Sequence, residues 1–395
     1  MDDIKNETNE HPQSNSKKTQ SQTFTNKSNR VQSQSSIASW SVSKIIIHCY
    51  VLSTAPSEPE EIDEMNEEPI TVCEVLPLPH ESLHTSWESL IYPKEIKENI
   101  IGYAESSLLF SNKGVCNHLI SWNRVLLLHG PPGTGKTSLC RALAQKLTIR
   151  TNSIFPSGGY LLEVKSHSLF SKWFSESGKL IAKLFERIRE MVEDEPKALF
   201  CVLIDEVESL ASSRISGGNG GGAAEPSDAV RAVNSVLTSL DSIRNFQNVL
   251  ILTTTNITES IDSAFVDRVD LKQYIGHPCM EARYEILRSC LLELIKVGII
   301  SDTPNCNLLK PFSDAVEESY AEPEGNDSRT PQHLLFACAE AAEGLSGRSL
   351  RKIPFQTHAF FVKSSDISPI DEFLTSLKSG IIMEKSSRAD LGKKN

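Results

Sequence analysis

An apolar stretch that runs directly into a glycine-rich turn and then a helical pattern constrains this chain more than any other feature. The stretch covers residues 125–128, and the turn after it fits the motif G-x-x-x-x-G-K-[ST]. Glycines at this spacing let backbone N–H groups close around phosphate oxygens, and the following helix adds the positive end of its dipole. In this motif Lys136 reaches the β- and γ-phosphates, and the Thr137 hydroxyl binds Mg²⁺. The candidate ATP-binding residues are Gly130, Pro131, Pro132, Gly133, Thr134, Gly135, Lys136, Thr137 and Ser138.

Around this motif, apolar strands alternate with helical patterns, which favours an α/β fold with a doubly wound parallel sheet. After a helical pattern at 87–110, we expect strands at 125–128, 160–164, 199–204 and 249–252, and helices at 137–147, 179–192 and 229–240. The strand at 199–204 is continuously apolar, as expected for a sheet covered on both faces.

Composition and hydrophobic pattern divide the chain into four parts. The predicted parts are a Ser/Gln-rich disordered tail at 1–40, a small N-terminal α+β element at 41–85, a large α/β domain at 86–277 and a small all-helical domain at 278–395. In the N-terminal element we expect strands at 41–51 and 72–76, separated by a solvated acidic linker at 56–68. In the last part we expect helices at 281–295, 334–343 and 349–362, with a loop insertion at 301–332.

Two carboxylates end the apolar strand at 199–204. Asp205 and Glu206 come directly after it, in an arrangement that resembles a Walker B segment. Asp205 is then the candidate Mg²⁺ ligand beside Thr137, and Glu206 the candidate general base that polarises the attacking water. The alternative is a strand that ends in two solvated acids.

Charge and cysteine usage narrow the class of protein. The formal net charge of −11 argues against a general nucleic-acid binder, which usually carries a basic footprint. The nine cysteines include no C-x-x-C pair, so reduced, largely buried thiols are expected rather than a zinc site. No apolar run approaches the length of a membrane span, and we expect a protein of the cytoplasm, the nucleus or both.

Several long strings resemble the pachytene checkpoint protein 2 (thyroid receptor-interacting protein 13) family of AAA+ ATPases, over about residues 70–365. The strings include ALAQKLTIR at 142–150, SHSLFSKWFSESGK at 166–179, LIDEVESL at 203–210 and EPSDA at 225–229. This resemblance implies a P-loop ATPase domain followed by a helical lid, and it makes the 41–85 element a region for recognising substrate or adaptor.

The resemblance also implies roles for three polar residues beyond the acidic pair. Asn256 lies in the polar run that follows the strand at 249–252. It corresponds to sensor 1, which orients water near the γ-phosphate. Arg268 corresponds to the finger that enters the neighbouring subunit's site, and Arg348 to sensor 2 of the lid. The alternatives are a helix-capping Asn256, a salt bridge from Arg268 to Asp267 or Asp270, and a basic helix face at Arg348.

The sequence predicts a polar loop with exposed aromatic residues at 166–177. Its residues Lys172, Trp173 and Phe174 match the first pore loop of AAA+ unfoldases, and the glycine-rich stretch 216–225 fits a second pore loop. The alternative for Trp173 is packing in the core.

The family resemblance implies a homo-hexamer that consumes ATP with Mg²⁺ and remodels HORMA-domain proteins of the meiotic chromosome axis and the spindle checkpoint. We also expect a comet-type adaptor and a location in the nucleus on chromosomes and in the cytoplasm. We expect no direct contact with nucleic acid and no association with membranes. Two other classes stay open: an ATP-gated binding scaffold, and a clamp-loader-like remodeller of nucleic acid.

Overall fold

The computed structural model describes residues 47–62, 70–116, 118–164, 177–208, 226–257, 263–301, 309–320, 330–362 and 367–392. The chain divides into two units, Met1–Tyr50 and Val51–Asn395, and every helix and strand named below lies in the second.

A seven-stranded sheet forms the centre of the ATPase part, in the order β1-β2-β4-β5-β6-β3-β7. Five of its strands are parallel: β4 (Gly159–Val164), β5 (Leu199–Ile204), β6 (Val249–Thr255), β3 (Val125–His129) and β7 (Leu271–Tyr274). The strand predictions for these segments are confirmed except for β7, which the apolar pattern missed. The α/β fold with a largely parallel sheet is therefore correct.

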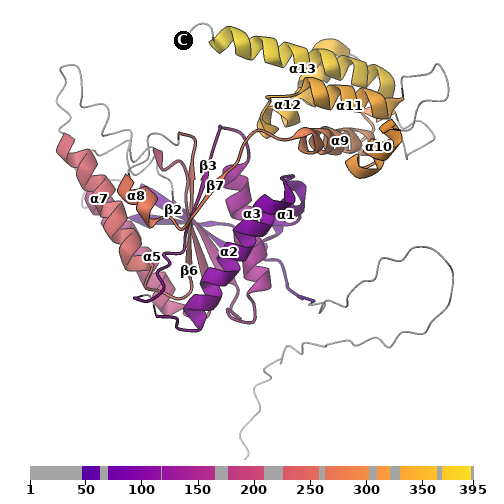
Figure 1. Cartoon of the computed structure of the whole chain (residues 1–395). Coiled ribbons are helices and arrows are strands. Elements are labelled where there is room, and N and C mark those ends of the chain that lie inside the picture. The colour runs from indigo at the N-terminus through magenta and orange to yellow at the C-terminus, as the bar shows by residue number, and fades with distance from the viewer. Residues whose placement is uncertain are drawn as a thin grey trace, which may run out of the picture. The chain divides into compact units, whose positions relative to one another are not determined.

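Helices cover both faces of this sheet, as Figure 1 shows for α2 (Lys94–Asn112) and α3 (Lys136–Arg150) on one side and α5 (Ser177–Asp194) and α7 (Pro226–Ile243) on the other. Alternate strand residues face opposite ways, so Leu126 packs with α2 and α3 while its neighbour Leu127 packs with α5 and α7. This double cover explains why the central strands are apolar along their whole length.

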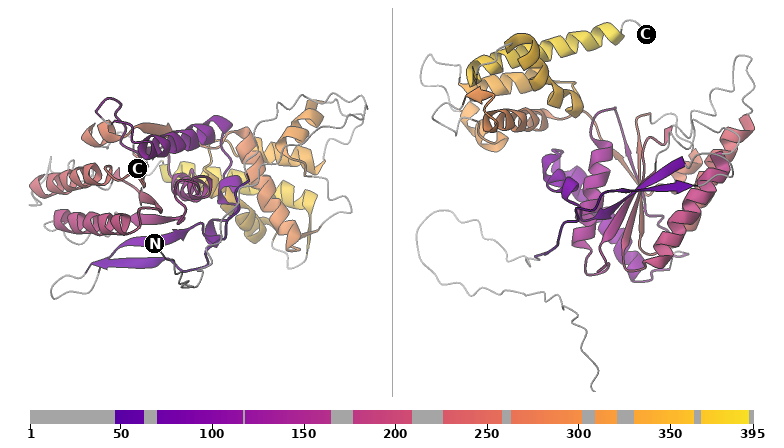
Figure 2. Two further views of the ribbon diagram at one scale, coloured as in Figure 1. Left: turned by 90° about the horizontal axis from the view of Figure 1, so that it is seen from below. Right: turned by 180° about the vertical axis from the view of Figure 1, so that it is seen from behind.

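Two strands that precede the ATPase motif in the chain extend the sheet beyond β4, and each pairs antiparallel with its neighbour. Strand β1 (Glu58–Ile62) pairs with β2 (Ile70–Leu78), and β2 pairs with β4. Figure 2 shows the two strands side by side at one edge of the sheet. The prediction of β2 is confirmed, but part of the expected acidic linker at 56–68 is the edge strand β1, where charged side chains suit a strand with one open side.

The strand expected at 41–51 is wrong where the structure describes it. Residues 47–51 carry no strand, and Ile47 and Val51 are 72% and 88% exposed. The helix expected at 87–110 is in fact two helices, α1 (Ser86–Ser89) and α2, because Pro93 precedes α2 as its N-cap residue.

The C-terminal part is helical, with its own core. Its helices are α9 (Met280–Lys296), α10 (Phe312–Tyr320), α11 (Pro331–Ala341), α12 (Gly347–Thr357), the π-helix His358–Val362 and α13 (Ile370–Gly392). Buried side chains of α9, α11, α12 and α13 form a single cluster. The expected loop at 301–332 contains α10, and α13 was not predicted. A two-stranded pairing of β8 (Ile300–Ser301) with β9 (Ser368–Pro369) completes this part.

The parallel strands β3, β5 and β6 end at one edge of the sheet, and the predicted polar residues follow those ends. Short helix α8 (Ser263–Arg268) lies between β6 and β7. No helix among the described ranges is long and apolar enough to span a membrane.

Candidate nucleotide site

The glycine-rich motif forms the turn between β3 and α3. Gly130 has a φ of 140°, and a Cβ atom there would fall on the carbonyl oxygen of Ile275. Gly133 has a φ of 76°, and its Cβ atom would lie 2.9 Å from Ser346 Oγ of the lid. The turn therefore needs glycine both for its backbone angles and for the close approach of two other segments.

Lys136 begins α3 and is 5% exposed. Its ammonium donates to the carbonyl oxygens of Gly130 (2.7 Å) and Pro131 (2.9 Å) and to Asn256 Oδ1 (2.8 Å). Burial lowers the pKa of Lys136, and nearby carboxylates, Glu208 first among them, oppose that shift. The structure thus brings together the lysine of the motif and the predicted sensor residue at the end of β6.

Thr137 and Asp205, the two predicted Mg²⁺ ligands, are in direct contact. Thr137 Oγ1 donates to the Asp205 carboxylate, at 2.8 Å from Oδ1 and 3.0 Å from Oδ2. Thr254 of β6 also donates its hydroxyl hydrogen to Asp205 Oδ1. Among the described residues, no group of three or more His, Cys, Asp or Glu could hold a metal ion alone. Hydroxyl and carboxylate oxygens nevertheless fit Mg²⁺, which commonly takes one or two protein ligands together with phosphates and water.

Glu206, the candidate general base, has a φ of 56°. Its amide donates to Thr254 Oγ1 at 3.1 Å, so the second acid of the pair is held by the neighbouring strand. Positive φ is uncommon outside glycine and concentrates at functional sites.

Asn256 contacts a carboxylate that the sequence did not single out. Both its backbone N–H (3.0 Å) and its side-chain Nδ2 (2.9 Å) donate to Glu208 Oε1, and Glu208 is 8% exposed. The side-chain bond to Glu208 leaves Asn256 Oδ1 directed at Lys136. Sequence reasoning also missed Thr254. The available signals were a third acid in the run after β5 and a run of three threonines before Asn256.

Arg348 approaches the phosphate-binding turn from the lid. Its backbone N–H donates to the carbonyl oxygen of Gly133 at 3.1 Å. A cavity of about 180 Å³ lies here, lined by Gly133 and other residues of the turn, by Tyr92, and by both Arg348 and Arg351 of α12. The Tyr92 hydroxyl donates to the carbonyl oxygen of Thr134 at 2.7 Å. The cavity lies between the turn, the segment before α2 and the lid, where a nucleotide bound through its phosphates could extend.

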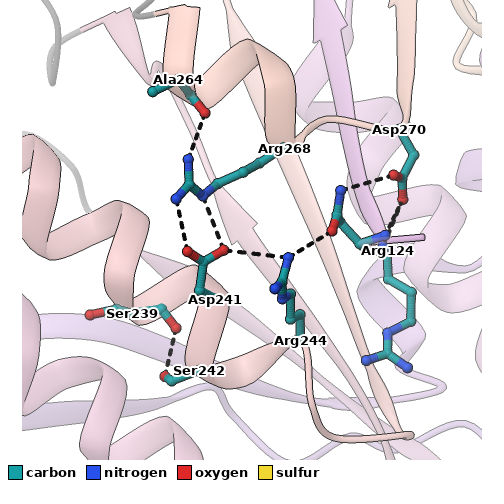
Figure 3. A network of polar contacts seen from close by, with 9 residues as sticks. Arg124, Ser239, Asp241, Ser242, Arg244, Ala264, Arg268 and Asp270 are labelled. Atoms are coloured by element: carbon teal, nitrogen blue, oxygen red, sulfur yellow. Dashed lines mark hydrogen bonds and ion pairs between the residues drawn. The ribbon is translucent and has the colours of Figure 1, made fainter. Parts of the chain in front are cut away.

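Arg268, at the end of α8, points to Asp241 near the end of α7 (Figure 3). Its Nε lies 3.0 Å from Asp241 Oδ1 and its Nη2 lies 2.8 Å from Oδ2, and its Nη1 donates to the carbonyl oxygen of Ala264. The sequence offered Asp267 or Asp270 as ion-pair partners, whereas this pair joins Arg268 to Asp241. The role of Arg268 toward a neighbouring subunit stays a prediction.

The same network continues from Asp241 toward the start of β3 (Figure 3). Arg244 contacts Asp241 at 3.6 Å and donates to Asn123 Oδ1 at 2.9 Å. Asn123 and the backbone N–H of Arg124 in turn donate to Asp270. The carboxylate that was an alternative partner for Arg268 is thus engaged by the segment that leads into the phosphate-binding strand.

The predicted pore-loop residues Lys172, Trp173 and Phe174 and the glycine-rich stretch 216–225 lie outside the described residues.

Comparison with known proteins agrees with this geometry. Residues 126–277 match the family model of ATPases associated with various cellular activities (AAA), and residues 279–385 match the TRIP13-like AAA+ ATPase lid C-terminal domain. A pachytene checkpoint protein 2 homolog of Arabidopsis thaliana is 51% identical over 317 residues, which cover 79% of this chain and 67% of the relative. The chain belongs to the pachytene checkpoint protein 2 family.

The relatives extend well beyond plants. The Homo sapiens pachytene checkpoint protein 2 homolog is 46% identical over 347 residues, covering 88% of this chain and 77% of the relative. The solved structure of C. elegans PCH-2 matches with a TM-score of 0.71 and 35% identity, covering 88% of this chain and 82% of that one. This member of the pachytene checkpoint protein 2 family is therefore a nucleotide-binding AAA+ ATPase with a TRIP13-like lid.

Proposed function

We propose that the chain works as a homo-hexameric ring that couples hydrolysis of Mg²⁺-bound ATP to the remodelling of HORMA-domain proteins. In this proposal it serves meiotic chromosome-axis and spindle-checkpoint control, is found in the nucleus on chromosomes and in the cytoplasm, and reaches some clients through a comet-type adaptor. Membership of the pachytene checkpoint protein 2 family supports the client class.

The convergence of Lys136, Asp205, Glu206 and Asn256 at the carboxyl ends of β3, β5 and β6 is the observation that carries the catalytic part. Lys136 and the amides of the glycine-rich turn bind the phosphates of ATP. Thr137 and Asp205 would hold Mg²⁺, which neutralises charge on the phosphates.

The remaining groups act on the attacking water and on developing charge. Glu206 accepts the proton of the water, and Asn256 orients that water through Oδ1, which Glu208 holds in place by binding Nδ2. Arg348 reaches the nucleotide from the lid. Arg268 acts on the neighbouring subunit's ATP, which makes the complete site a property of the ring.

In the same proposal, Lys172, Trp173 and Phe174 grip the client in the central pore. Aromatic side chains provide large contact area with little dependence on the sequence of the segment being pulled. The net charge of −11 supports a protein client over a nucleic acid.

The decisive experiment compares wild type with Glu206→Gln, and with Glu193→Gln as a control at an exposed carboxylate on α5. We expect Glu206→Gln to bind ATP and to lose about 10²–10⁴-fold in turnover. It should bind a HORMA-domain client without remodelling it. Glu193→Gln should match wild type in all three measurements.

Equal turnover well above background in wild type and Glu206→Gln would overturn the assignment of Glu206 as general base, and background turnover in both would favour an ATP-gated scaffold. Stimulation of turnover by DNA, with none by a HORMA-domain protein, would overturn the client assignment and favour a nucleic-acid remodeller. Native mass spectrometry in ATP tests the hexamer directly.

A further inference from the structure

The hydroxyl of Thr254 lies between the two acids at the end of β5. Thr254 is 1% exposed. Its hydroxyl donates to Asp205 Oδ1 and accepts the backbone N–H of Glu206 at 3.1 Å. A hydroxyl can donate one hydrogen bond and accept two. The Thr254 hydroxyl can therefore donate to the carboxylate of Asp205 and accept from the N–H of Glu206 at the same time.

Thr254 also binds the residue after the acidic pair. Its carbonyl oxygen accepts the N–H of Val207 at 2.9 Å. The regular pairing of β5 with β6 ends at Ile204 opposite Thr253, so these contacts lie directly beyond the ladder. Two successive amides after β5 are therefore held by one residue of β6.

These contacts fall where the backbone is strained. Glu206 has a φ of 56°, a left-handed conformation that residues with a side chain rarely adopt. Such a conformation persists only where the surrounding structure holds it. The Thr254 hydroxyl supplies one such contact, to the backbone N–H of Glu206.

Thr253 provides an internal comparison on the same strand. It is 0% exposed, and its hydroxyl donates to the carbonyl oxygen of Leu126 on β3 at 2.9 Å. Adjacent residues of a strand face opposite sides of the sheet. Thr253 and Thr254 thus share burial and hydrogen bonding, but Thr254 contacts the acids.

We infer that Thr254 is a positioning residue for ATP hydrolysis, which orients Asp205 toward Thr137 and holds Glu206 in its left-handed conformation. This inference rests on the proposed roles of Asp205 and Glu206. Thr254 acts through those two residues and does not itself touch the reacting atoms.

The test replaces each hydroxyl by an isosteric methyl group in the full-length protein. We expect Thr254→Val to lower kcat for ATP about 10- to 100-fold, since a misplacement of about 1 Å costs on this order. Direct titration with ATP should show affinity changed by less than about threefold, because the phosphate loop is untouched. Thr253→Val should keep kcat within about twofold while losing a comparable buried hydrogen bond and comparable thermal stability.

Two further variants separate positioning from a general effect on the fold. Thr254→Ser keeps the hydroxyl and should restore most of the lost kcat. If Thr254→Val does not fold, Thr254→Cys is compared with Thr254→Ser. Both lack the γ-methyl group, and they differ in a weakly hydrogen-bonding thiol against a hydroxyl, so the Cys variant should lose kcat relative to the Ser variant.

The combination of Thr254→Val with Glu206→Gln should be no slower than Glu206→Gln alone, because residues that act as a unit are not additive. Equal kcat for Thr254→Val and Thr253→Val, with Glu206→Gln inactive, would overturn the inference and leave the proposed function standing. A fully active Glu206→Gln would overturn the proposed function instead.

Discussion

Replacing Gly130 by alanine tests whether the phosphate-binding turn is held by close backbone approach. Gly130 has a φ of 140°, and its added Cβ would fall on the carbonyl oxygen of Ile275. That segment cannot easily yield, because the Ile275 N–H is bound to the carbonyl oxygen of His129 at 2.8 Å. Gly114→Ala is the matched control, since Gly114 has a φ of 65° but open space around its Cβ position.

The two substitutions differ mainly in a steric contribution. Both place an alanine at positive φ, which costs about 1–2 kcal/mol at the φ of Gly114 and at least as much at the φ of Gly130, outside the left-handed helical region. Overlap with packed atoms adds about 1–3 kcal/mol, and only the Gly130 variant carries it. Gly130→Ala is therefore expected to lose about 1–3 kcal/mol more unfolding free energy than Gly114→Ala.

Urea unfolding followed by circular dichroism measures this difference, with midpoints compared at a common slope. ATP titration should show weak or no binding by Gly130→Ala and normal binding by Gly114→Ala. Equal losses of stability in the two variants, or normal ATP binding by Gly130→Ala, would refute the steric argument.

Three other predictions concern separate groups. Arg268→Ala should lower ATP turnover about 10³-fold or more with ATP binding kept, whereas Arg244→Ala, from the same network, should not; similar phosphate-release rates for both would place the finger elsewhere. Alkylation of the native protein, read by mass spectrometry, should label exposed Cys279 before Cys201, because burial raises the pKa of the Cys201 thiol to about 12; early labelling of Cys201 would contradict this. Burial lowers the pKa of His129, so the unfolded chain takes up its proton first and stability should fall as the pH drops below about 6.5; an equally steep fall in His129→Gln would exclude this histidine as a cause.

Local signals account for the parts of the fold that were predictable. The strand at 199–204 was placed at its observed limits because both its faces are buried, which makes every residue apolar. Strand β7 alternates between partly buried and exposed residues over four positions, too short a run to stand out. Strand β1 is charged because it is an edge, so composition alone favours a linker.

Helix α13 shows a different kind of omission. Its core residues follow helical spacing, and they are Ile370, Phe373, Leu374, Leu377 and Ile381. A periodicity search continued beyond residue 362 therefore predicts it. Helix α10 is harder, because its nine residues lie in a stretch rich in proline, serine and acidic residues.

The site divides in the same way. Motif spacing indicated Lys136, Asp205 and Glu206, and the family resemblance indicated Asn256. Contacts made through strand register, such as that of Thr254, have no counterpart in the linear sequence, because they depend on which residue of β6 lies beyond Ile204.

The phosphate-binding turn contacts three segments that are far apart in the chain. The carbonyl group of Ile275, after β7, lies against Gly130. The Tyr92 hydroxyl donates to the carbonyl oxygen of Thr134, and the N–H of Arg348 donates to the carbonyl oxygen of Gly133. The last contact involves the first turn of α12, which also packs into the lid core through Leu350. A change in the shape of the turn must therefore strain or break a bond to the lid, because Gly133 and Arg348 are joined through backbone atoms that no rotamer change can replace. Among the described residues, the N–H of Arg348 and the close approach of Ser346 to Gly133 therefore couple the phosphate-binding turn to the start of α12 in the lid.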